Sequence, residues 1–202
     1  MDHPNIVKLY DIYNTTKRVV LSTEYCGNVN LQNYLEQNTN VIKLATIKEI
    51  ILSLTKALAY LEARGICHRD IKLDNILIND MGVVKLIDFG FAVMQEDKEL
   101  ITNFCGTPSY MSPEIINRDP YDGHKADMWA LGVVMFRLIC GKYPFKGSHE
   151  NDLYAAVLNG KLNFPPGTSK PSVDLIERLL SKDPKCRPTA KEALLDHWFR
   201  SN

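Results

Sequence analysis

The residues best suited to chemistry lie in the segment His68–Asn75, which reads HRDIKLDN. Asp70 can accept or orient the proton of a hydroxyl group, Lys72 can stabilise a phosphoryl group in transfer, and Asn75 can offer a neutral oxygen to Mg²⁺. A second carboxylate follows a short apolar stretch, in Asp88-Phe89-Gly90, where a reversal of the chain would bring it back beside Asn75. These residue types in this order predict a site for phosphoryl transfer.

Two elements must hold this segment in place. Apolar residues recur at steps of three and four over residues 47–61, which predicts a long helix that ends near Gly65 and leads into the segment. After the segment, residues 76–78 and 83–87 are apolar and flank a turn that contains a glycine, a pattern typical of a β-hairpin. This hairpin would set the spacing between the asparagine and the second carboxylate.

The rest of the pattern is mainly helical, apart from one further hairpin and one long loop. Residues 4–26 alternate as strands do, around a polar turn. Residues 90–114 are mostly irregular, and a loop of that length in a compact domain usually has a function. Residues 127–136 are apolar nearly all round and predict a buried helix, with Asp127 capping its start. Further helices are expected at residues 28–37, 152–158, 173–180 and 190–199.

Length and composition favour one main domain without a strong overall charge. The 202 residues are 45% hydrophobic, which is enough for one substantial core. Lys plus Arg and Asp plus Glu both number 24, so the formal net charge is zero and no overall field favours nucleic acid or anionic membranes. We expect neither a nucleic-acid partner nor a membrane partner.

The cysteines and the apolar stretches indicate in which cellular compartment the protein is expected. The 5 cysteines are scattered and form no C-x-x-C pair, which argues against a disulfide framework and against a zinc site. The longest apolar stretch, residues 130–139, contains Arg137 and is too short to cross a bilayer. The N-terminus lacks the basic region and apolar run of a secretory signal. A soluble intracellular protein is expected, in the cytoplasm, with the nucleus not excluded.

Two further motifs extend the pattern downstream, Gly106-Thr107-Pro108 and Ser112-Pro113-Glu114. A lone His-Arg-Asp is usually no more than a solvated turn. All these motifs together, in this order, resemble the catalytic domain of eukaryotic protein kinases. The resemblance implies an α+β, protein-kinase-like fold. Residues 27–202 would form its mainly α-helical large lobe, with the catalytic loop (residues 68–75) and the activation segment (residues 90–114). Residues 1–26 would be a remnant β-hairpin of the small lobe, with the fourth and fifth strands of the family's small lobe and the hinge (residues 24–26).

The same resemblance implies roles for individual side chains, with ATP and Mg²⁺ as cofactors. The catalytic residues would be Asp70, Lys72 and Thr107, and the Thr107 hydroxyl would hydrogen-bond to the other two. The metal ligands would be Asn75 and Asp88. The residues around the nucleotide would be Thr23, Glu24, Cys26, Leu77 and Ile87.

Two supporting contacts are also implied by the resemblance. Asp127 would hold the backbone of the catalytic loop, and Arg187 would pair with Glu114 at the end of the activation segment. The alternative for the second contact is a solvent-exposed salt bridge, which would contribute little to stability.

The resemblance also indicates a class of kinase. Lys72 and Thr107 form the serine/threonine type of signature, which implies a protein substrate with a Ser or Thr acceptor. The closing stretch through His197-Trp198-Phe199 is most similar to the calmodulin-dependent and SNF1-like branch. Thr102 is a candidate phosphorylation site, with the Arg69 guanidinium as the partner of the phosphate.

Some kinase features are missing from the 202 residues, which contain no glycine-rich phosphate loop, no Val-Ala-x-Lys lysine and no helix glutamate to pair with it. We therefore expect an N-terminally truncated catalytic domain. Loss of a single preorganised donor costs about 3–4 kcal/mol of transition-state stabilisation, so this chain alone should have little or no activity. The exposed edges of the hairpin at residues 4–26 would also invite a partner chain to cover them.

Two other interpretations stay open at this point. A non-catalytic, pseudokinase-like binding or scaffolding protein is favoured by the missing lysine, whereas the retained metal ligands speak against it. A small-molecule kinase with a similar catalytic loop is a third interpretation. The motifs around Thr107 and Ser112 speak against the third, because they build a platform for an extended peptide.

Overall fold

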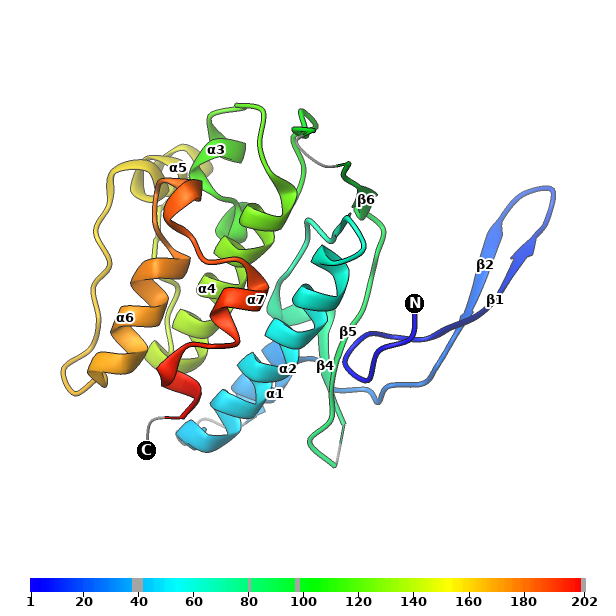
Figure 1. The fold of residues 1–202 in the computed structure, drawn as a ribbon, viewed down its shortest axis with the longest axis horizontal. Helices are drawn as coiled ribbons and strands as arrows, with labels where there is room; N and C mark the ends of the chain where they lie inside the picture. The colour runs from blue at the N-terminus through cyan, green and yellow to red at the C-terminus, as the bar shows by residue number, and fades with distance from the viewer. Residues whose placement is uncertain (38–41, 80, 97–98, 201–202) are drawn as a thin grey trace.

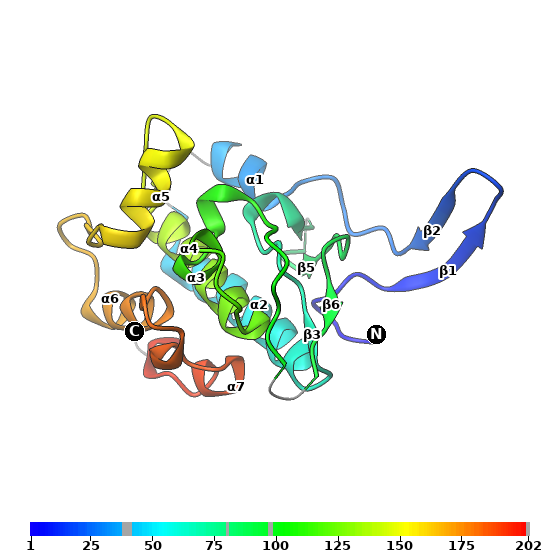
Figure 2. The ribbon, with the colours of Figure 1, turned by 90° about the horizontal axis from the view of Figure 1, so that it is seen from above.

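The chain forms a helical body from which one β-hairpin projects (Figure 1). The computed structural model describes residues 1–37, 42–79, 81–96 and 99–200. Seen from above in Figure 2, two long helices, α2 and α4, occupy the middle of the body, and shorter helices lie around them. The helices are α1 (Leu31–Gln37), α2 (Leu44–Glu62), α3 (Pro113–Ile116), α4 (Gly123–Cys140), α5 (Glu150–Asn159), α6 (Lys170–Leu179) and α7 (Ala190–Ala193).

The strands form small antiparallel pairs. Residues 5–7 extend the pair formed by residues 76–78 and 84–86, because the Val7 amide donates to the Leu86 carbonyl and the Leu86 amide donates to the Asn5 carbonyl. The expected α+β class, with a mainly helical body and a hairpin, is confirmed. The pairs are β1 (Leu9–Asn14) with β2 (Val19–Thr23), β3 (Ile66–Cys67) with β6 (Val93–Met94), and β4 (Ile76–Ile78) with β5 (Val84–Leu86).

Both central helices follow from their apolar patterns. The buried residues of α2 form the stripe that its three- and four-residue steps predict, from Ile47 through Leu54 to Leu61. In α4 every residue from Ala126 to Phe136 is buried, because other elements pack around it. The helix ends at Gly141, whose φ of 67° lies in the left-handed region that favours glycine.

The start of α4 differs from the expectation. The helix begins at Gly123, where Asp122 caps it by accepting hydrogen bonds from the amides of His124 and Lys125. Asp127 therefore lies inside the helix, and the prediction that it caps the first turn is wrong. Because Asp122, about one turn earlier, already caps the helix, the Asp127 carboxylate points away from its own helix.

The C-terminal helix expected at residues 190–199 is also wrong. Helix α7 ends at Ala193, and a 3-10 turn follows at His197–Phe199, capped by the Asp196 side chain. The Trp198 side chain is fully buried, and its Nε1 donates a 2.8 Å hydrogen bond to the Ser172 hydroxyl. The break in the helix therefore coincides with a buried contact between Trp198 and a residue of α6.

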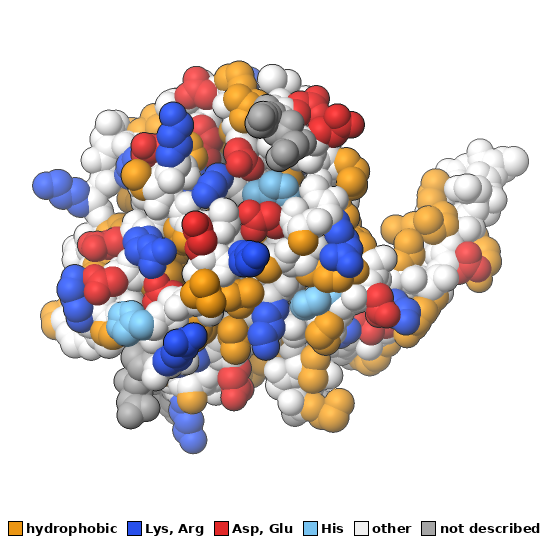
Figure 3. All heavy atoms as spheres, viewed as in Figure 1, with side chains coloured by type: hydrophobic (Ala, Val, Ile, Leu, Met, Phe, Trp, Pro, Cys, Tyr) orange, Lys and Arg blue, Asp and Glu red, His pale blue; other side chains and the backbone are white. Residues whose placement is uncertain are grey.

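The projecting hairpin β1–β2 is apolar but exposed, and its side chains are visible as orange spheres in Figure 3. Residues 5–7 behind it dock on the body, where Ile6 is 1% exposed. The hairpin is therefore anchored at its base and solvated along its length. The exposed apolar residues are Leu9, Tyr10, Ile12, Tyr13, Val19, Val20 and Leu21.

Two expectations from composition can be compared with the structure. The cysteines at 26, 67, 105, 140 and 186 are free thiols, as the absence of a paired spacing predicts. In the part of the chain that the structure describes, no helix combines the length and the apolar character needed to cross a bilayer.

Candidate active site

Helix α4 holds the catalytic loop from behind. The Asp127 carboxylate accepts a 2.7 Å hydrogen bond from the His68 amide on one oxygen and a 2.8 Å bond from the Arg69 amide on the other. Burial raises the pKa of Asp127 to about 7, and the two amide hydrogen bonds act in the opposite direction. The loop is thereby attached to the most deeply buried helix of the body.

Two residues of the candidate site have a left-handed backbone. Arg69 has a φ of 65° and Asp88 a φ of 61°. Such a conformation costs about 1–3 kcal/mol in a residue other than glycine, so the surroundings must hold it. The Arg69 backbone is held by Asp127, and its Nε donates a 2.7 Å hydrogen bond to the Phe91 carbonyl. Backbone strain that the surroundings impose is typical of functional sites.

The Asp70 carboxylate is the centre of a network of four side chains. Thr107 donates a 2.8 Å hydrogen bond to its Oδ1, and Asn75 donates a 2.9 Å bond to its Oδ2. Lys72 Nζ lies 2.8 Å from Oδ2 and also donates to the Thr107 hydroxyl over 3.1 Å. The Asp70 side chain is 3% exposed and that of Lys72 is 22% exposed, so the network is largely shielded from water. The structure thus brings the three predicted catalytic residues together.

His68 connects the catalytic loop to the strand that leads to Asp88. Its Nδ1 accepts a 3.2 Å hydrogen bond from the Asp70 amide, and its Nε2 lies 3.0 Å from the Ile87 carbonyl. These partners require a neutral ring that carries its proton on Nε2. Burial lowers the pKa of His68, in agreement with a neutral ring. His68 begins the predicted segment, but its residue type alone does not indicate these contacts.

Asn75 directly precedes β4 and Asp88 follows β5, so the β4–β5 hairpin sets their separation. The Ile87 amide donates a 3.0 Å hydrogen bond to the Asn75 carbonyl. The Asn75 side-chain nitrogen donates hydrogen bonds to Asp70, so the Asn75 side-chain oxygen is directed away from Asp70. Within the described ranges, no three His, Cys, Asp or Glu side chains form a group that could hold a metal alone. Mg²⁺ commonly binds to one or two protein oxygens together with nucleotide phosphates, and this pair fits that mode.

A cavity of about 570 Å³ lies between the hinge segment and the β4–β5 pair. Its volume is within the range of small-molecule sites. Its walls are mainly apolar, and the Asp88 carboxylate lies among its lining residues. A flat apolar ring with a phosphate chain directed towards Asp88 would suit this shape. The lining includes all five residues predicted to surround the nucleotide, which are Thr23, Glu24, Cys26, Leu77 and Ile87.

The two predicted carboxylates do not line the same cavity. Asp70 and Thr107 line a separate pocket of about 20 Å³, behind the catalytic network. Among the described residues, the 20 Å³ pocket contains Asp70 and not Asp88, and the 570 Å³ cavity contains Asp88 and not Asp70. Their connection runs through the hydrogen bonds of His68 and Asn75 with Ile87. The candidate site therefore has two parts, a network and a cavity, joined by backbone contacts.

The start of the activation segment is held by a side chain that the sequence analysis missed. The Oε1 atom of Gln95 accepts hydrogen bonds from the Cys67 thiol over 3.0 Å and from the Gly123 amide over 2.9 Å. A Cβ atom at Gly123 would lie 2.6 Å from the Cys67 sulfur, so only glycine fits there. These contacts join residues 28 positions apart, and no local pattern in the sequence indicates them.

The end of the activation segment is held by a buried ion pair. Arg187 donates two hydrogen bonds to Glu114, of 2.6 Å and 2.7 Å, in a bidentate arrangement. The side chain of Arg187 is 0% exposed and that of Glu114 is 10% exposed. The alternative of a solvent-exposed salt bridge is therefore wrong for this pair. The guanidinium also lies 5.0 Å from the centre of the Trp129 ring, which packs it into the core.

A helical body, a carboxylate that follows β5 and a His-Arg-Asp loop attached to a buried helix together define a protein-kinase-like class of fold. A family model described as "Protein kinase domain" matches residues 1–199. The chain therefore belongs to the protein kinase domain family, and the expected protein-kinase-like fold is confirmed.

Curated relatives with this domain are named as kinases. The chain is 36% identical to a probable serine/threonine-protein kinase from Dictyostelium discoideum, over 100% of this chain and 24% of the relative. It is 34% identical to CBL-interacting protein kinase 32 from Oryza sativa subsp. japonica, over 98% of this chain and 46% of the relative. It is 36% identical to Sperm motility kinase 2B from Mus musculus, over 98% of this chain and 40% of the relative. The chain spans less than half the length of each of these relatives.

Proposed function

We propose that this chain carries the catalytic loop of a serine/threonine protein kinase, which transfers the γ-phosphoryl group of ATP to a protein hydroxyl. The observation that carries the proposal is the buried network in which Thr107, Lys72 and Asn75 all contact the Asp70 carboxylate. A phosphoryl acceptor needs a carboxylate that orients its hydroxyl and a cation beside it, and Asp70 and Lys72 supply these groups. The Thr107 hydroxyl would hold the Asp70 carboxylate and the Lys72 ammonium group in a fixed orientation.

ATP and Mg²⁺ are proposed as the cofactors. The family generally uses them, and the apolar cavity next to Asp88 supports a nucleotide. Bound Mg²⁺ would neutralise charge that develops on the phosphates. Asn75 and Asp88 would supply its protein oxygens. Thr23, Glu24, Cys26, Leu77 and Ile87 would surround the adenine ring and exclude water from it.

The division of the chain and its branch are also proposals. Residues 1–26 would be the small-lobe strands and hinge, and residues 27–202 the large lobe; the projection of β1–β2 from the body supports this boundary. The calmodulin-dependent and SNF1-like branch is supported by the similarity to CBL-interacting kinases. The contacts of Thr107 with Asp70 and Lys72 support a Ser or Thr acceptor in a protein substrate.

Thr102 is proposed as a phosphorylation site on the activation segment. Its side chain is exposed, so an upstream kinase could reach it. The Nη1 atom of Arg69 is buried and has no hydrogen-bond partner within the described residues, which leaves it able to bind an additional acceptor. A phosphate can supply such an acceptor to a guanidinium.

Turnover by the 202-residue chain on its own should be weak, because its sequence contains no glycine-rich loop over the phosphates. The test is incubation of the purified chain with Mg-ATP and a broad peptide library, beside the Asp70→Asn variant. We expect Mg-dependent nucleotide binding with slow transfer to Ser and Thr peptides, abolished by Asp70→Asn. Turnover as fast as that of an intact kinase would refute weak activity. Transfer that is unchanged in Asp70→Asn would refute the assigned role.

A non-catalytic scaffold is the second candidate. The retained Asn75 and Asp88 count against it, because a purely binding surface has no physical need for a pair of oxygen ligands, of which Asp88 lines the apolar cavity. A chain that binds no nucleotide with or without Mg²⁺ would favour the scaffold.

A further inference from the structure

An ion pair that no sequence motif indicates joins a lining residue of the nucleotide cavity to the strand that leads into two other lining residues. Glu24 follows β2 and lines the cavity, while Lys85 is the central residue of β5. The Glu24 Oε1 atom lies 2.5 Å from Lys85 Nζ, and the two side chains are 19% and 17% exposed. The same oxygen accepts a 3.1 Å hydrogen bond from the Lys8 amide. Burial tends to raise the pKa of Glu24, but the hydrogen bonds from Lys85 and the Lys8 amide outweigh it and lower the pKa.

The two partners lie on chain segments with different tasks in the proposed function. The backbone around Glu24 forms the wall that would contact adenine. Strand β5 leads directly into Ile87 and Asp88, which also line the cavity. Lys85 is not among the residues that line the cavity, so it can act on a nucleotide only through its partner.

Among the main-chain contacts that hold this region, none runs directly from Glu24 to β5 in the described residues. A backbone hydrogen bond between Val7 and Leu86 joins the N-terminal segment to β5. The Glu24 amide donates a 2.9 Å hydrogen bond to the carbonyl of Lys8, the residue before β1, and so joins the hinge to the same N-terminal segment. The ion pair adds a side-chain link that crosses directly from the hinge to β5. Because both side chains are largely shielded from water, this link is screened less than a surface pair.

We propose that Lys85 is a positioning residue, whose ion pair with Glu24 sets the separation between the adenine-binding backbone and the Asp88 carboxylate. The inference rests on the proposed function, because it assigns that cavity to a Mg-nucleotide. A nucleotide has a fixed distance between its ring and its metal-bound phosphates. If the hinge moves relative to β5, the cavity can still bind either the ring or the metal-bound phosphates well, but it binds the two together less well.

The first measurement is ADP binding by calorimetry, with Mg²⁺ and with EDTA. The ratio of the two affinities reports how well the ring and the metal are held together, and a change in general stability alone would not alter it. We expect this ratio to fall about tenfold or more in Lys85→Met, the size of effect that a displacement below 1 Å can produce. Lys85→Arg should restore most of it. Lys8→Met is the matched control, because the Lys8 ammonium pairs only loosely with exposed Asp2, at 3.8 Å. An unchanged ratio in Lys85→Met would overturn the proposal.

The second measurement is amide hydrogen exchange over residues 24–27 without ligand. Exchange should become faster in Lys85→Met and in Glu24→Gln, and should stay as in the wild type in Lys85→Arg and Lys8→Met. Equal exchange in all five proteins would overturn the proposal even if the wild type binds no ADP. Absence of ADP binding by the wild type would instead count against the nucleotide site itself, so the two failures are distinguishable.

Discussion

The hydroxyl of Thr107 donates a 2.8 Å hydrogen bond to Oδ1 of Asp70, 37 positions earlier in the chain. The same hydroxyl accepts a 3.1 Å hydrogen bond from Lys72. A single side chain of the activation segment therefore fixes both charged groups of the catalytic loop. If that segment moves, the geometry of the loop changes with it.

Replacement of Thr107 tests this coupling. Thr107→Val keeps the shape but removes the hydroxyl, so the buried carboxylate loses one donor and Lys72 loses one acceptor. A hydrogen bond to a charged group contributes about 1.5–3 kcal/mol, which corresponds to a loss of roughly ten- to a hundredfold in kcat/KM. The measurement is the initial rate of transfer from radiolabelled ATP. Thr107→Ser keeps the hydroxyl and should retain most of the rate; equal rates in the Val and Ser variants would contradict the coupling.

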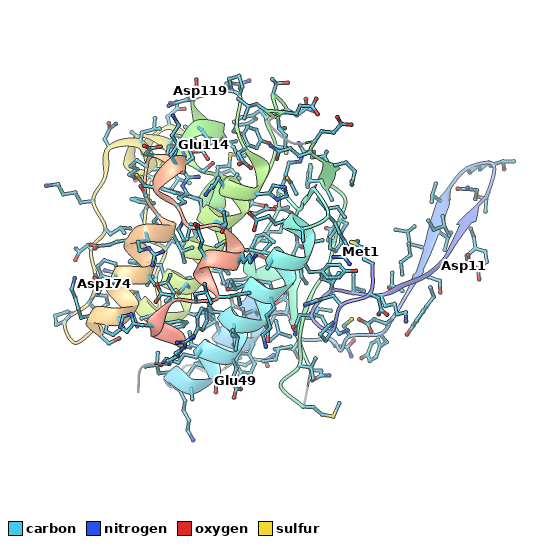
Figure 4. All side chains as sticks on the ribbon, viewed as in Figure 1. Met1, Asp11, Glu49, Glu114, Asp119 and Asp174 are labelled. Atoms are coloured by element: carbon cyan, nitrogen blue, oxygen red, sulfur yellow. The ribbon has the colours of Figure 1, made fainter. Side chains whose placement is uncertain are left out.

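The Glu114–Arg187 pair should be important for stability. Figure 4 labels both Glu114, on α3, and Asp174, on α6; the Glu114 side chain is 10% exposed, whereas that of Asp174 is 43% exposed. Glu114→Gln leaves the Arg187 charge buried without its counterion, which should lower the free energy of unfolding by about 3–5 kcal/mol in urea denaturation. The control is Lys170→Met, which removes the exposed pair with Asp174 and should change the free energy little. Similar small effects in both variants would show that burial of the first pair is unimportant.

The pH dependence of stability should reveal Lys182. Burial, and then the charge of Arg187, lower the pKa of Lys182 to about 8. The unfolded chain therefore holds this proton more tightly than the folded chain does, so stability is lost as pH falls towards 8 and is recovered as pH rises towards 10.5. The free energy of unfolding of the wild type, relative to Lys182→Met, should increase between pH 8 and pH 10.

Urea denaturation at several pH values provides the check. Lys170→Met is the control, because the hydrogen bond and the charge of Asp174 raise the pKa of Lys170 rather than lower it. A Lys182→Met difference that stays flat or shrinks as pH rises would contradict the assignment.

Much of the fold could be predicted because it depends on local pattern. The apolar steps of α2 and the continuous apolar run of α4 each indicate how the helix is buried, and a glycine marks the end of α4. The errors arose where a tertiary partner decided the outcome. The expected last helix breaks where Trp198 contacts Ser172, and Asp122 caps α4 one turn before the expected residue.

The residues of the candidate site that belong to motifs could be predicted, whereas its contacts between distant segments could not. The residues of the catalytic network and of the cavity lining could be proposed because their motifs have a fixed order along the chain. The Glu24–Lys85 pair and the Gln95 contacts could not, because each joins distant segments through single side chains. His68 lay inside the recognised motif, yet its contact with Ile87 depends on the fold of the β4–β5 hairpin.

Asp88 and Asn75 would supply the protein oxygens for Mg²⁺ next to a nucleotide in the adjacent cavity, and the proposed function depends on this role. The most direct measurement is the affinity for ADP, with Mg²⁺ and with EDTA, in the wild type, in Asp88→Asn and in the surface control Asp174→Asn. We predict that Mg²⁺ strengthens binding in the wild type and in the control, and that this gain disappears in Asp88→Asn. Binding that gains equally from Mg²⁺ in all three proteins would contradict the account.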